Sequence, residues 1–155
     1  MPPTLRQAKT EDAESVSRLI NDAFRSERFF SDEDRTNPNE VRDLMKKGIF
    51  LLADEEEKPI ACVYLEPRGD RFYLGLLSVA PSRQKSGLGS FLMNAAEDYA
   101  RSHGARAMDL QIVNVRTELP SYYRRFGYTE TGTTPFPPHK KTKMPCHLVV
   151  YSKSL

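Results

Sequence analysis

The chain is built around the apolar run Arg71-Phe72-Tyr73-Leu74-Gly75-Leu76-Leu77-Ser78-Val79, the loop Arg83-Gln84-Lys85-Ser86-Gly87-Leu88-Gly89, and a helical pattern that reaches Gly104. A run that is apolar at nearly every position is typical of a strand buried on both faces, and Pro81 ends it. Beyond the loop, apolar residues recur at helical spacing, namely Leu88, Phe91, Leu92, Ala95, Ala96 and Tyr99. The segment therefore predicts a strand, a tight loop and a core-facing helix, with Gly104 as the C′ residue that ends it.

The loop has the features of a backbone anion site. The first turn of a helix leaves N–H groups without intrahelical partners, and the positive end of the helix dipole lies there. Glycine at positions 87 and 89 removes the Cβ atoms that would keep a pyrophosphate away from the backbone, and it permits positive φ angles. A phosphate group is therefore expected at this helix start.

Other interpretations of the glycine loop fit less well. A dinucleotide-binding G-x-G-x-x-G loop needs a small residue where Leu92 stands, and a Walker A loop needs Lys and Ser after the glycine, whereas Lys85 and Ser86 precede it. A tight turn without a ligand stays open on the local pattern alone. The remaining pattern is Gln-x-x-Gly-x-Gly, from Gln84 to Gly89.

At this point the sequence resembles the GNAT superfamily of acetyl-CoA-dependent N-acetyltransferases, whose Q/R-x-x-G-x-G/A signature follows such a strand and opens such a helix. A second motif, Ser121-Tyr122-Tyr123-Arg124-Arg125-Phe126-Gly127-Tyr128, resembles the short helix of the family that carries a tyrosine four residues before a glycine. Two motifs in this order are more specific than one glycine loop. The resemblance extends from about Thr4 to the C-terminus.

The remaining periodicities predict an α/β fold with helices on both faces of a mixed, mostly antiparallel sheet. We expect about seven strands and about four helices, and the resemblance implies that the fourth and fifth strands splay apart. The predicted strands are residues 5–8, 49–53, 59–66, 71–79, 107–113, 128–131 and 147–153, and the predicted helices are residues 10–24 with Thr10 as N-cap, 39–47, the helix that follows the glycine loop, and the short segment before Gly127.

Size and composition narrow the class of protein. The 155 residues predict a single domain, residues 1–155, and a net charge of +2 gives no reason to expect nucleic acid or an acidic membrane as partner. No run approaches the roughly 18 apolar residues of a membrane span, which indicates a cytoplasmic protein. Cys62 and Cys146 have no spacing typical of disulfides or zinc, so we expect reduced thiols and no metal. Oligomeric state is left open between monomer and homodimer.

The resemblance implies acetyl-CoA as co-substrate. Its pantetheine arm would pair with the backbone of Leu77, Ser78 and Val79, and its pyrophosphate would rest on the loop N–H groups. Asn114 would take the place of a family asparagine, because Arg116 stands where that residue is common. The loop residues implied in binding are Arg83, Gln84, Lys85, Ser86, Gly87, Leu88, Gly89 and Ser90.

Acetyl transfer from a thioester needs a neutral amine, a stabilised oxyanion and a proton for the leaving thiolate. By resemblance Tyr123 is the general acid, and a backbone N–H near Leu77 holds the oxyanion. The fourth strand carries no carboxylate, so the base is sought elsewhere. Glu66 is the first candidate, and the others are Tyr64, Glu27 and Glu118.

The acceptor is expected between the long segment 25–37, the third strand and the proline-rich segment around Phe136. The residues expected to contact it are Glu27, Phe29, Phe30 and Tyr64, and the acidic residues of the segment hint at a cationic acceptor. The function predicted is transfer of acetyl from acetyl-CoA to a primary amine of a small molecule or peptide, by direct attack in a ternary complex. The alternatives are a non-catalytic acyl-CoA-binding module of the same fold and a protein that binds ATP or NAD at the glycine loop.

Overall fold

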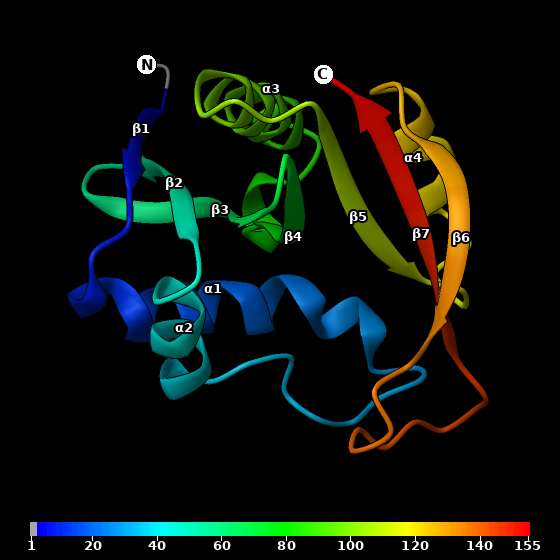
Figure 1. Cartoon of the computed structure of the whole chain (residues 1–155). Helices are drawn as coiled ribbons and strands as arrows, with labels where there is room; N and C mark the ends of the chain where they lie inside the picture. The colour runs from blue at the N-terminus through cyan, green and yellow to red at the C-terminus, as the bar shows by residue number, and fades with distance from the viewer. Residues whose placement is uncertain (1–2) are drawn as a thin grey trace.

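The computed structural model describes residues 3–155 and contains one seven-stranded sheet in the order β1-β2-β3-β4-β5-β7-β6 (Figure 1). The strands are β1 (Thr4–Gln7), β2 (Ile49–Glu55), β3 (Lys58–Arg68), β4 (Arg71–Val79), β5 (Ala107–Val113), β6 (Thr129–Pro135) and β7 (His147–Ser154), and the α-helices are α1 (Ala13–Ala23), α2 (Pro38–Met45), α3 (Leu88–Ser102) and α4 (Leu119–Arg124). Every pair of neighbouring strands is antiparallel except β4 and β5. The predicted mixed sheet with helices on both faces is confirmed.

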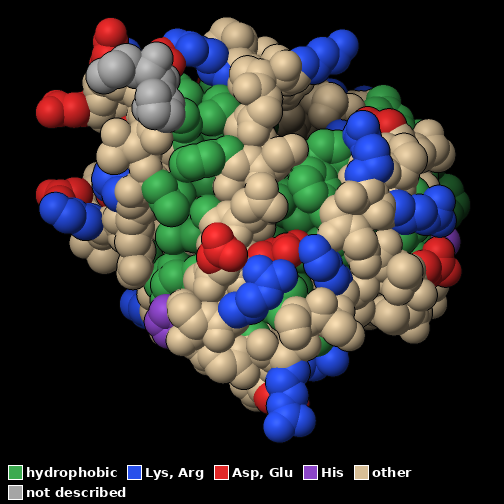
Figure 2. Space-filling model, turned by 90° about the horizontal axis from the view of Figure 1, so that it is seen from above, with side chains coloured by type: hydrophobic (Ala, Val, Ile, Leu, Met, Phe, Trp, Pro, Cys, Tyr) green, Lys and Arg blue, Asp and Glu red, His purple; other side chains and the backbone are tan. Residues whose placement is uncertain are grey.

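Two apolar layers hold the helices on the sheet. On one face α3 packs its buried residues, including Leu92 and Ala96, against β2 to β5. On the other face α1 and α2 pack against β2 and β3, with Val16, Ile20 and Val41 fully buried. Figure 1 shows α3 on one side of the sheet and α1 with α2 on the other. Seen from the α3 side, hydrophobic side chains show between backbone and polar groups, and charges of both signs lie near the middle of the face as well as at its edge (Figure 2).

The strands β4 and β5 pair only at one end. Their parallel register joins Arg71, Phe72 and Tyr73 to Ala107, Met108 and Asp109. Asp109 also accepts two hydrogen bonds from the Arg71 guanidinium, at 2.6 and 2.8 Å. Beyond these residues β4 continues on β3 and β5 continues on β7, and Figure 1 shows the two strands diverging. The predicted splay of the fourth and fifth strands is confirmed.

A bulge lies in β4 where the two strands have parted. The β3–β4 register shifts between Cys62 and Tyr64, and Leu76 on the opposite strand has a φ of +54°. A leucine in the left-handed region costs roughly 1–2 kcal/mol, and such strain is characteristic of functional sites. The bulge turns the next residues of β4, including Leu77, relative to a regular strand.

The ends of α3 follow the prediction. Gly87 precedes the helix with a φ of +87°, and Gly104 follows it with a φ of +82°. The Gly104 N–H donates to the Arg101 carbonyl at 3.1 Å, and the Ala105 N–H donates to the Ala100 carbonyl at 3.0 Å. These two bonds form a Schellman motif with Gly104 at C′.

Three predicted boundaries are wrong. Thr10 is not a helix cap, because residues 10–12 form a 3₁₀ turn in which the Asp12 carboxylate accepts from the Lys9 N–H at 2.7 Å. The second helix begins at Pro38, since the Asn37 side chain caps it by accepting from the Glu40 N–H. The sixth strand runs to Pro135, which an edge strand tolerates because a missing N–H on its outer side breaks no ladder bond.

Cys62 and Cys146 are free thiols, as predicted. Within residues 3–155 no helix is long and apolar enough to cross a membrane.

Candidate functional site

A cavity of about 670 Å³, here called the large cavity, lies beside the splayed strands. It is enclosed by the end of β4, the glycine loop, the start of α3, α4 and the residues that follow α1. Many of the predicted cofactor residues line it, namely Leu77, Val79, Arg83, Gln84, Lys85, Gly87, Leu88, Gly89, Ser90 and Tyr123. Chain segments up to about 100 residues apart in sequence, from Ala23 to Arg125, thus contribute to one concave surface, of the size typical of ligand sites.

The glycine loop presents backbone donors to the large cavity. No side chain caps the start of α3, so the N–H groups of the first turn remain available to a ligand. A Cβ atom on Gly89 would stand 2.3 Å from the Tyr122 hydroxyl, and glycine is therefore the residue that allows this approach. The loop has the shape and polarity that an anion requires.

The charged side chains around the glycine loop differ in whether another residue already binds them. Arg83 is bound by both carboxylate oxygens of Glu55, which ties it to the β2–β3 hairpin. Lys85 lines the cavity with a φ of +63°. Arg125 also lines it, with its guanidinium 5.6 Å from the centre of the Tyr122 ring. Arg125 was not predicted as a cofactor residue from the sequence. Its position two residues after Tyr123 is the signal that would have identified it.

Three of the predicted cofactor residues do not line the large cavity. The Ser78 hydroxyl is buried and donates to the Leu76 carbonyl at 2.9 Å. The Ser86 hydroxyl donates to the Arg83 carbonyl. The Asn114 Oδ1 accepts from the His147 N–H at 2.8 Å, and the Asn114 N–H donates to the His147 carbonyl at 2.9 Å. Asn114 therefore extends the β5–β7 pairing.

Tyr123 presents its ring between two other tyrosines. The ring packs edge-on against Tyr122, with centroids 5.1 Å apart, and against Tyr128, with centroids 6.4 Å apart. Burial raises the pKa of the Tyr123 phenol well above its ordinary value, so the hydroxyl carries its proton at neutral pH. Within residues 3–155 this hydroxyl has no hydrogen-bond partner, which leaves it free to donate to a ligand.

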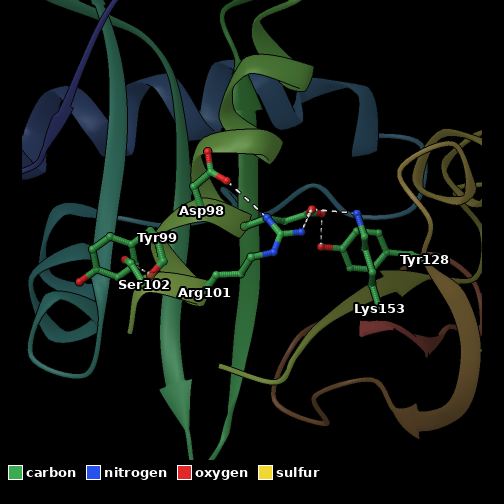
Figure 3. A network of polar contacts seen from close by, with 7 residues as sticks. Asp98, Tyr99, Arg101, Ser102, Tyr128 and Lys153 are labelled. Carbon is green, nitrogen blue, oxygen red and sulfur yellow. Dashed lines mark hydrogen bonds and ion pairs between the residues drawn. The ribbon is translucent and has the colours of Figure 1, made fainter. Parts of the chain in front are cut away.

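A buried ionic network holds the neighbouring Tyr128 in place. The Tyr128 hydroxyl donates to Glu97 at 3.0 Å, and Lys153 donates to the same carboxylate at 2.8 Å. Arg101 lies 3.5 Å from it. Figure 3 shows Arg101, Tyr128 and Lys153 pointing toward one another from α3, the residue before β6, and β7. The network fixes the ring on which Tyr123 packs.

A second, small cavity of about 100 Å³ adjoins the first. It lies between the segment after α1 and the segment between β6 and β7. The two segments lie side by side in Figure 1, and they are joined by the Lys143 N–H, which donates to the Phe30 carbonyl at 2.7 Å, and by an ion pair of Lys143 with Asp32 at 2.9 Å. The residues that line it are Phe24, Glu27, Phe30, Ser31, Glu33, Asp34, Arg35, Val113, Phe136 and Lys140.

The two cavities have one lining residue in common, and two other lining residues form an ion pair. Phe24 lines both of them. Arg116, which lines the large cavity, donates to Glu27, which lines the small one, at 2.9 Å. Burial raises the pKa of Glu27, although the positive Arg116 opposes this shift. Lining residues of the two cavities are therefore in direct contact.

The predicted acceptor and base residues separate into those at a cavity and those elsewhere. Glu27 and Phe30 line the small cavity, while the Phe29 side chain is exposed. Tyr64 is buried beneath α2, where its hydroxyl donates to Glu66 at 2.7 Å and lies 3.0 Å from the Leu44 carbonyl. Neither Tyr64 nor Glu66 lines the small or the large cavity.

The environment of Glu66 is that of an ion pair. Partial burial would by itself raise the pKa of Glu66, but hydrogen bonds from Arg68 and Tyr64 outweigh it and leave that pKa below its usual value. A carboxylate held in this way is a weaker base. Glu118, the remaining candidate, lines the large cavity and accepts from Arg116 at 3.1 Å.

Comparison with known proteins identifies the fold and the family. The model of the acetyltransferase (GNAT) family matches residues 13–128. An uncharacterized N-acetyltransferase of Bacillus subtilis, YhfO, is 32% identical over 133 residues, which covers 81% of this chain and 89% of that protein. The streptothricin acetyltransferase of Streptomyces lavendulae is 32% identical over 84 residues, covering 54% of this chain and 44% of that protein.

A solved structure is similar over nearly the whole chain. The aminoglycoside 6'-N-acetyltransferase complexed with coenzyme A superposes with a TM-score of 0.77 at 17% identity, covering 97% of this chain and 96% of that one. At this identity the likeness concerns the fold. Together with the family match and the relative in Bacillus subtilis, it leads to one conclusion: the chain belongs to the GNAT family of acetyltransferases.

Proposed function

We propose that the protein transfers the acetyl group of acetyl-CoA to a primary amine, by direct attack of the amine within a ternary complex. The observation that carries this proposal is the junction of the two cavities. The large cavity combines a backbone anion site, the splayed end of β4 and the Tyr123 hydroxyl, and a smaller cavity opens beside it. One cavity suits a long phosphorylated cofactor and the other suits a compact acceptor.

The large cavity fits acetyl-CoA in three respects. Its volume of about 670 Å³ lies within the range of ligand sites. The start of α3 offers unpartnered N–H groups to a pyrophosphate, and Lys85 and Arg125 supply positive charge beside them. The part of β4 that has left β5 offers backbone groups to an extended amide-containing arm. When bound, the cofactor supplies an activated acetyl thioester.

The residues of this chain then divide the proton transfers. An alkylammonium titrates near 10.4, so the acceptor must lose a proton before attack. We assign this proton to the Glu27 carboxylate, because it lines the acceptor side of the junction and burial raises its pKa. A backbone N–H near Leu77 stabilises the oxyanion. Tyr123 donates its phenolic proton to the leaving sulfur, and the proton that the nitrogen loses as the amide forms restores the phenol. Glu66 has no part in this scheme because it lines neither cavity.

The names of two similar proteins support a small-molecule acceptor. One relative is a streptothricin acetyltransferase, and one structural neighbour is an aminoglycoside 6'-N-acetyltransferase. Both names refer to small molecules rather than to proteins. The small cavity, at about 100 Å³, favours the same class.

The first experiment is a thermal-shift titration against acetyl-CoA, CoA, ATP and NAD, followed by a thiol-release assay with a panel of amines. A ligand at about 100 times its Kd adds about 2.7 kcal/mol of stability, so binding is readily seen. We expect stabilisation by the CoA species and amine-dependent thiol release. Stabilisation without thiol release for any amine would favour the non-catalytic acyl-CoA-binding module, and stabilisation by ATP or NAD alone would favour the nucleotide-binding alternative.

A further inference from the structure

The small cavity contains two cationic side chains without a carboxylate partner. Arg35 and Lys140 are both half-buried and both line this cavity. Within residues 3–155 neither side chain takes part in an ion pair or a side-chain hydrogen bond. The Arg35 guanidinium instead lies 5.4 Å from the centre of the Phe24 ring. An aromatic face can hold an arginine in place while its N–H groups remain available.

The carboxylates of the same segment are already neutralised by other residues. Glu27 is paired with Arg116 at 2.9 Å, Asp34 with Arg28 at 3.0 Å, and Asp32 with Lys143 at 2.9 Å. Glu33 also lines the cavity, but its side chain is exposed and its charge is screened by water. Asp32 and Asp34 therefore hold the walls of the cavity, Glu27 is paired while it serves as the proposed base, and the two side chains left without an ion pair are the cations Arg35 and Lys140.

Two neighbouring cations in a partly apolar cavity are unfavourable until an anion joins them. Burial, and next the positive charge of Arg35, lower the pKa of Lys140, and the negative charges of Glu40, Glu33 and Glu27 oppose this shift without cancelling it. Phe24, Phe30 and Phe136 contribute apolar walls, and exclusion of water by such walls strengthens every charge interaction inside. A carboxylate or phosphonate between the two cations would relieve their repulsion and accept a charge-assisted hydrogen bond from each.

From these contacts we infer that the acceptor amine carries an anionic group, held between Arg35 and Lys140, so that the substrate is of the amino-acid type. The inference rests on the proposed function and narrows its substrate class. The volume of about 100 Å³ suits an amine, a carboxylate and a short apolar body. It does not suit a peptide chain, in which the carboxylate lies far from the N-terminal amine.

The test compares amino acids with their carboxamides. Glycine, alanine, leucine, methionine and phenylalanine, and the carboxamide of each, are assayed for thiol release with acetyl-CoA, and 2-aminoethylphosphonate tests a second kind of anion. A carboxamide has the more acidic ammonium and offers more neutral amine at a given pH, so chemistry alone favours it. We expect the opposite order, with kcat/KM at least tenfold higher for the acid. Equal or higher kcat/KM for the carboxamide throughout would overturn the inference.

Variants of Arg35 and Lys140 test whether these two cations cause the preference for the acid over the carboxamide. In Arg35→Met and Lys140→Met the aliphatic stem remains while the charge is lost. Each is expected to raise KM for the preferred acid about tenfold, to leave the carboxamide unchanged, and to leave KM for acetyl-CoA unchanged. Lys141→Met is the matched control, because Lys141 is exposed and lines neither cavity. An unchanged KM for the acid in both cavity variants would contradict the assignment.

Direct binding separates failure of the inference from failure of the proposed function. Calorimetric titration of the CoA-loaded protein with each acid and its carboxamide needs no turnover. Binding of the acid alone, weakened in Lys140→Met, would support the anion site even if no amine were acetylated, and the proposed function would then fail by itself. Acetylation with equal affinity for acid and carboxamide would leave the function standing and overturn the inference.

Discussion

The anion-binding part of the large cavity is formed by one local stretch of backbone, whereas the small cavity lies between two segments more than 100 residues apart that are joined by tertiary contacts. In the first, Gly87, Gly89 and the start of α3 set the surface, and hydrogen bonds within regular elements fix it. In the second, ion pairs such as Lys143 with Asp32 hold the walls. The difference predicts that substitutions on one side change binding of one substrate and leave the other unaffected.

The largest effect is expected at Tyr123, which lines the large cavity. Tyr123→Phe removes the proposed proton donor and keeps the ring that packs against Tyr122 and Tyr128. General acid catalysis contributes roughly 10²–10⁴ in rate, so kcat for thiol release should fall by about that factor while KM for either substrate changes little. Tyr99→Phe is the control, since Tyr99 packs on Phe72 and lines no part of the large cavity. A kcat that Tyr123→Phe leaves unchanged would remove Tyr123 from the mechanism.

The next prediction tests whether the large cavity is made by backbone. Gly87 and Gly104 have φ angles of +87° and +82°, and a Cβ on either meets no atom within 4 Å. Alanine at each position should therefore destabilise the fold by about 1–2 kcal/mol, measured by urea unfolding. Only Gly87→Ala should also raise KM for acetyl-CoA, by about tenfold, since only Gly87 lines the cavity. An equal effect on KM in both variants would mean that α3 stability, rather than the loop surface, controls cofactor binding.

A smaller effect is expected when a side-chain contact between the two wall segments of the small cavity is removed. Lys143→Ala removes the ion pair with Asp32, whose two side chains are 47% and 76% exposed. Exposed pairs contribute about 0–1 kcal/mol, so the free energy of unfolding should barely change. The acceptor KM should nevertheless rise severalfold, because the two wall segments lose a contact, and KM for acetyl-CoA should stay constant. Lys141→Ala is the control, and acceptor kinetics identical in the two variants would contradict the prediction.

The smallest effect concerns pH. Because burial and Arg35 lower the pKa of Lys140, its ammonium loses its proton at a lower pH than an ordinary lysine. Affinity for an anion at this site should be present below that pKa and decline as pH rises through it, while Arg35 keeps part of the affinity. Calorimetry with the N-acetylated amino acid, which has no titrating amine, measures this directly.

Two comparisons complete the pH experiment. Lys140→Met should show a flat profile, and binding of CoA, which rests on backbone N–H groups, should lack the Lys140 step. A decline of the same size in Lys140→Met as in the original protein would assign it to another group.

More of the large cavity than of the small one could be predicted from the sequence, and the reason is physical. The strand of residues 71–79, the glycine loop and both ends of α3 are local patterns, and the structure has them where the periodicity and Gly104 indicate. The roles of Arg35 and Lys140 depend on which carboxylates already have partners. No local sequence pattern shows that Arg116 forms an ion pair with Glu27, which lies 89 positions away.

Glu66 and Asn114 illustrate the same limit. Glu66 lies on a predicted strand, but its carboxylate accepts hydrogen bonds from Arg68 and Tyr64 and lines neither cavity. Asn114 lies near the expected position but bonds to the β7 backbone at His147. In both cases the strand was predictable and the partner of the side chain was not, because the partner comes from tertiary packing.

The short β4–β5 pairing has a consequence for backbone exchange with solvent. These strands lie inside the sheet, yet beyond Tyr73 and Asp109 they do not pair with each other. Amides of β4 that point toward β5 should exchange hydrogen for deuterium at rates typical of an exposed edge, while those bonded to β3 remain protected. A molecule lying between the strands would complete the ladder and slow that exchange. Mass spectrometry of the β4 peptide would then report occupancy without any reaction taking place.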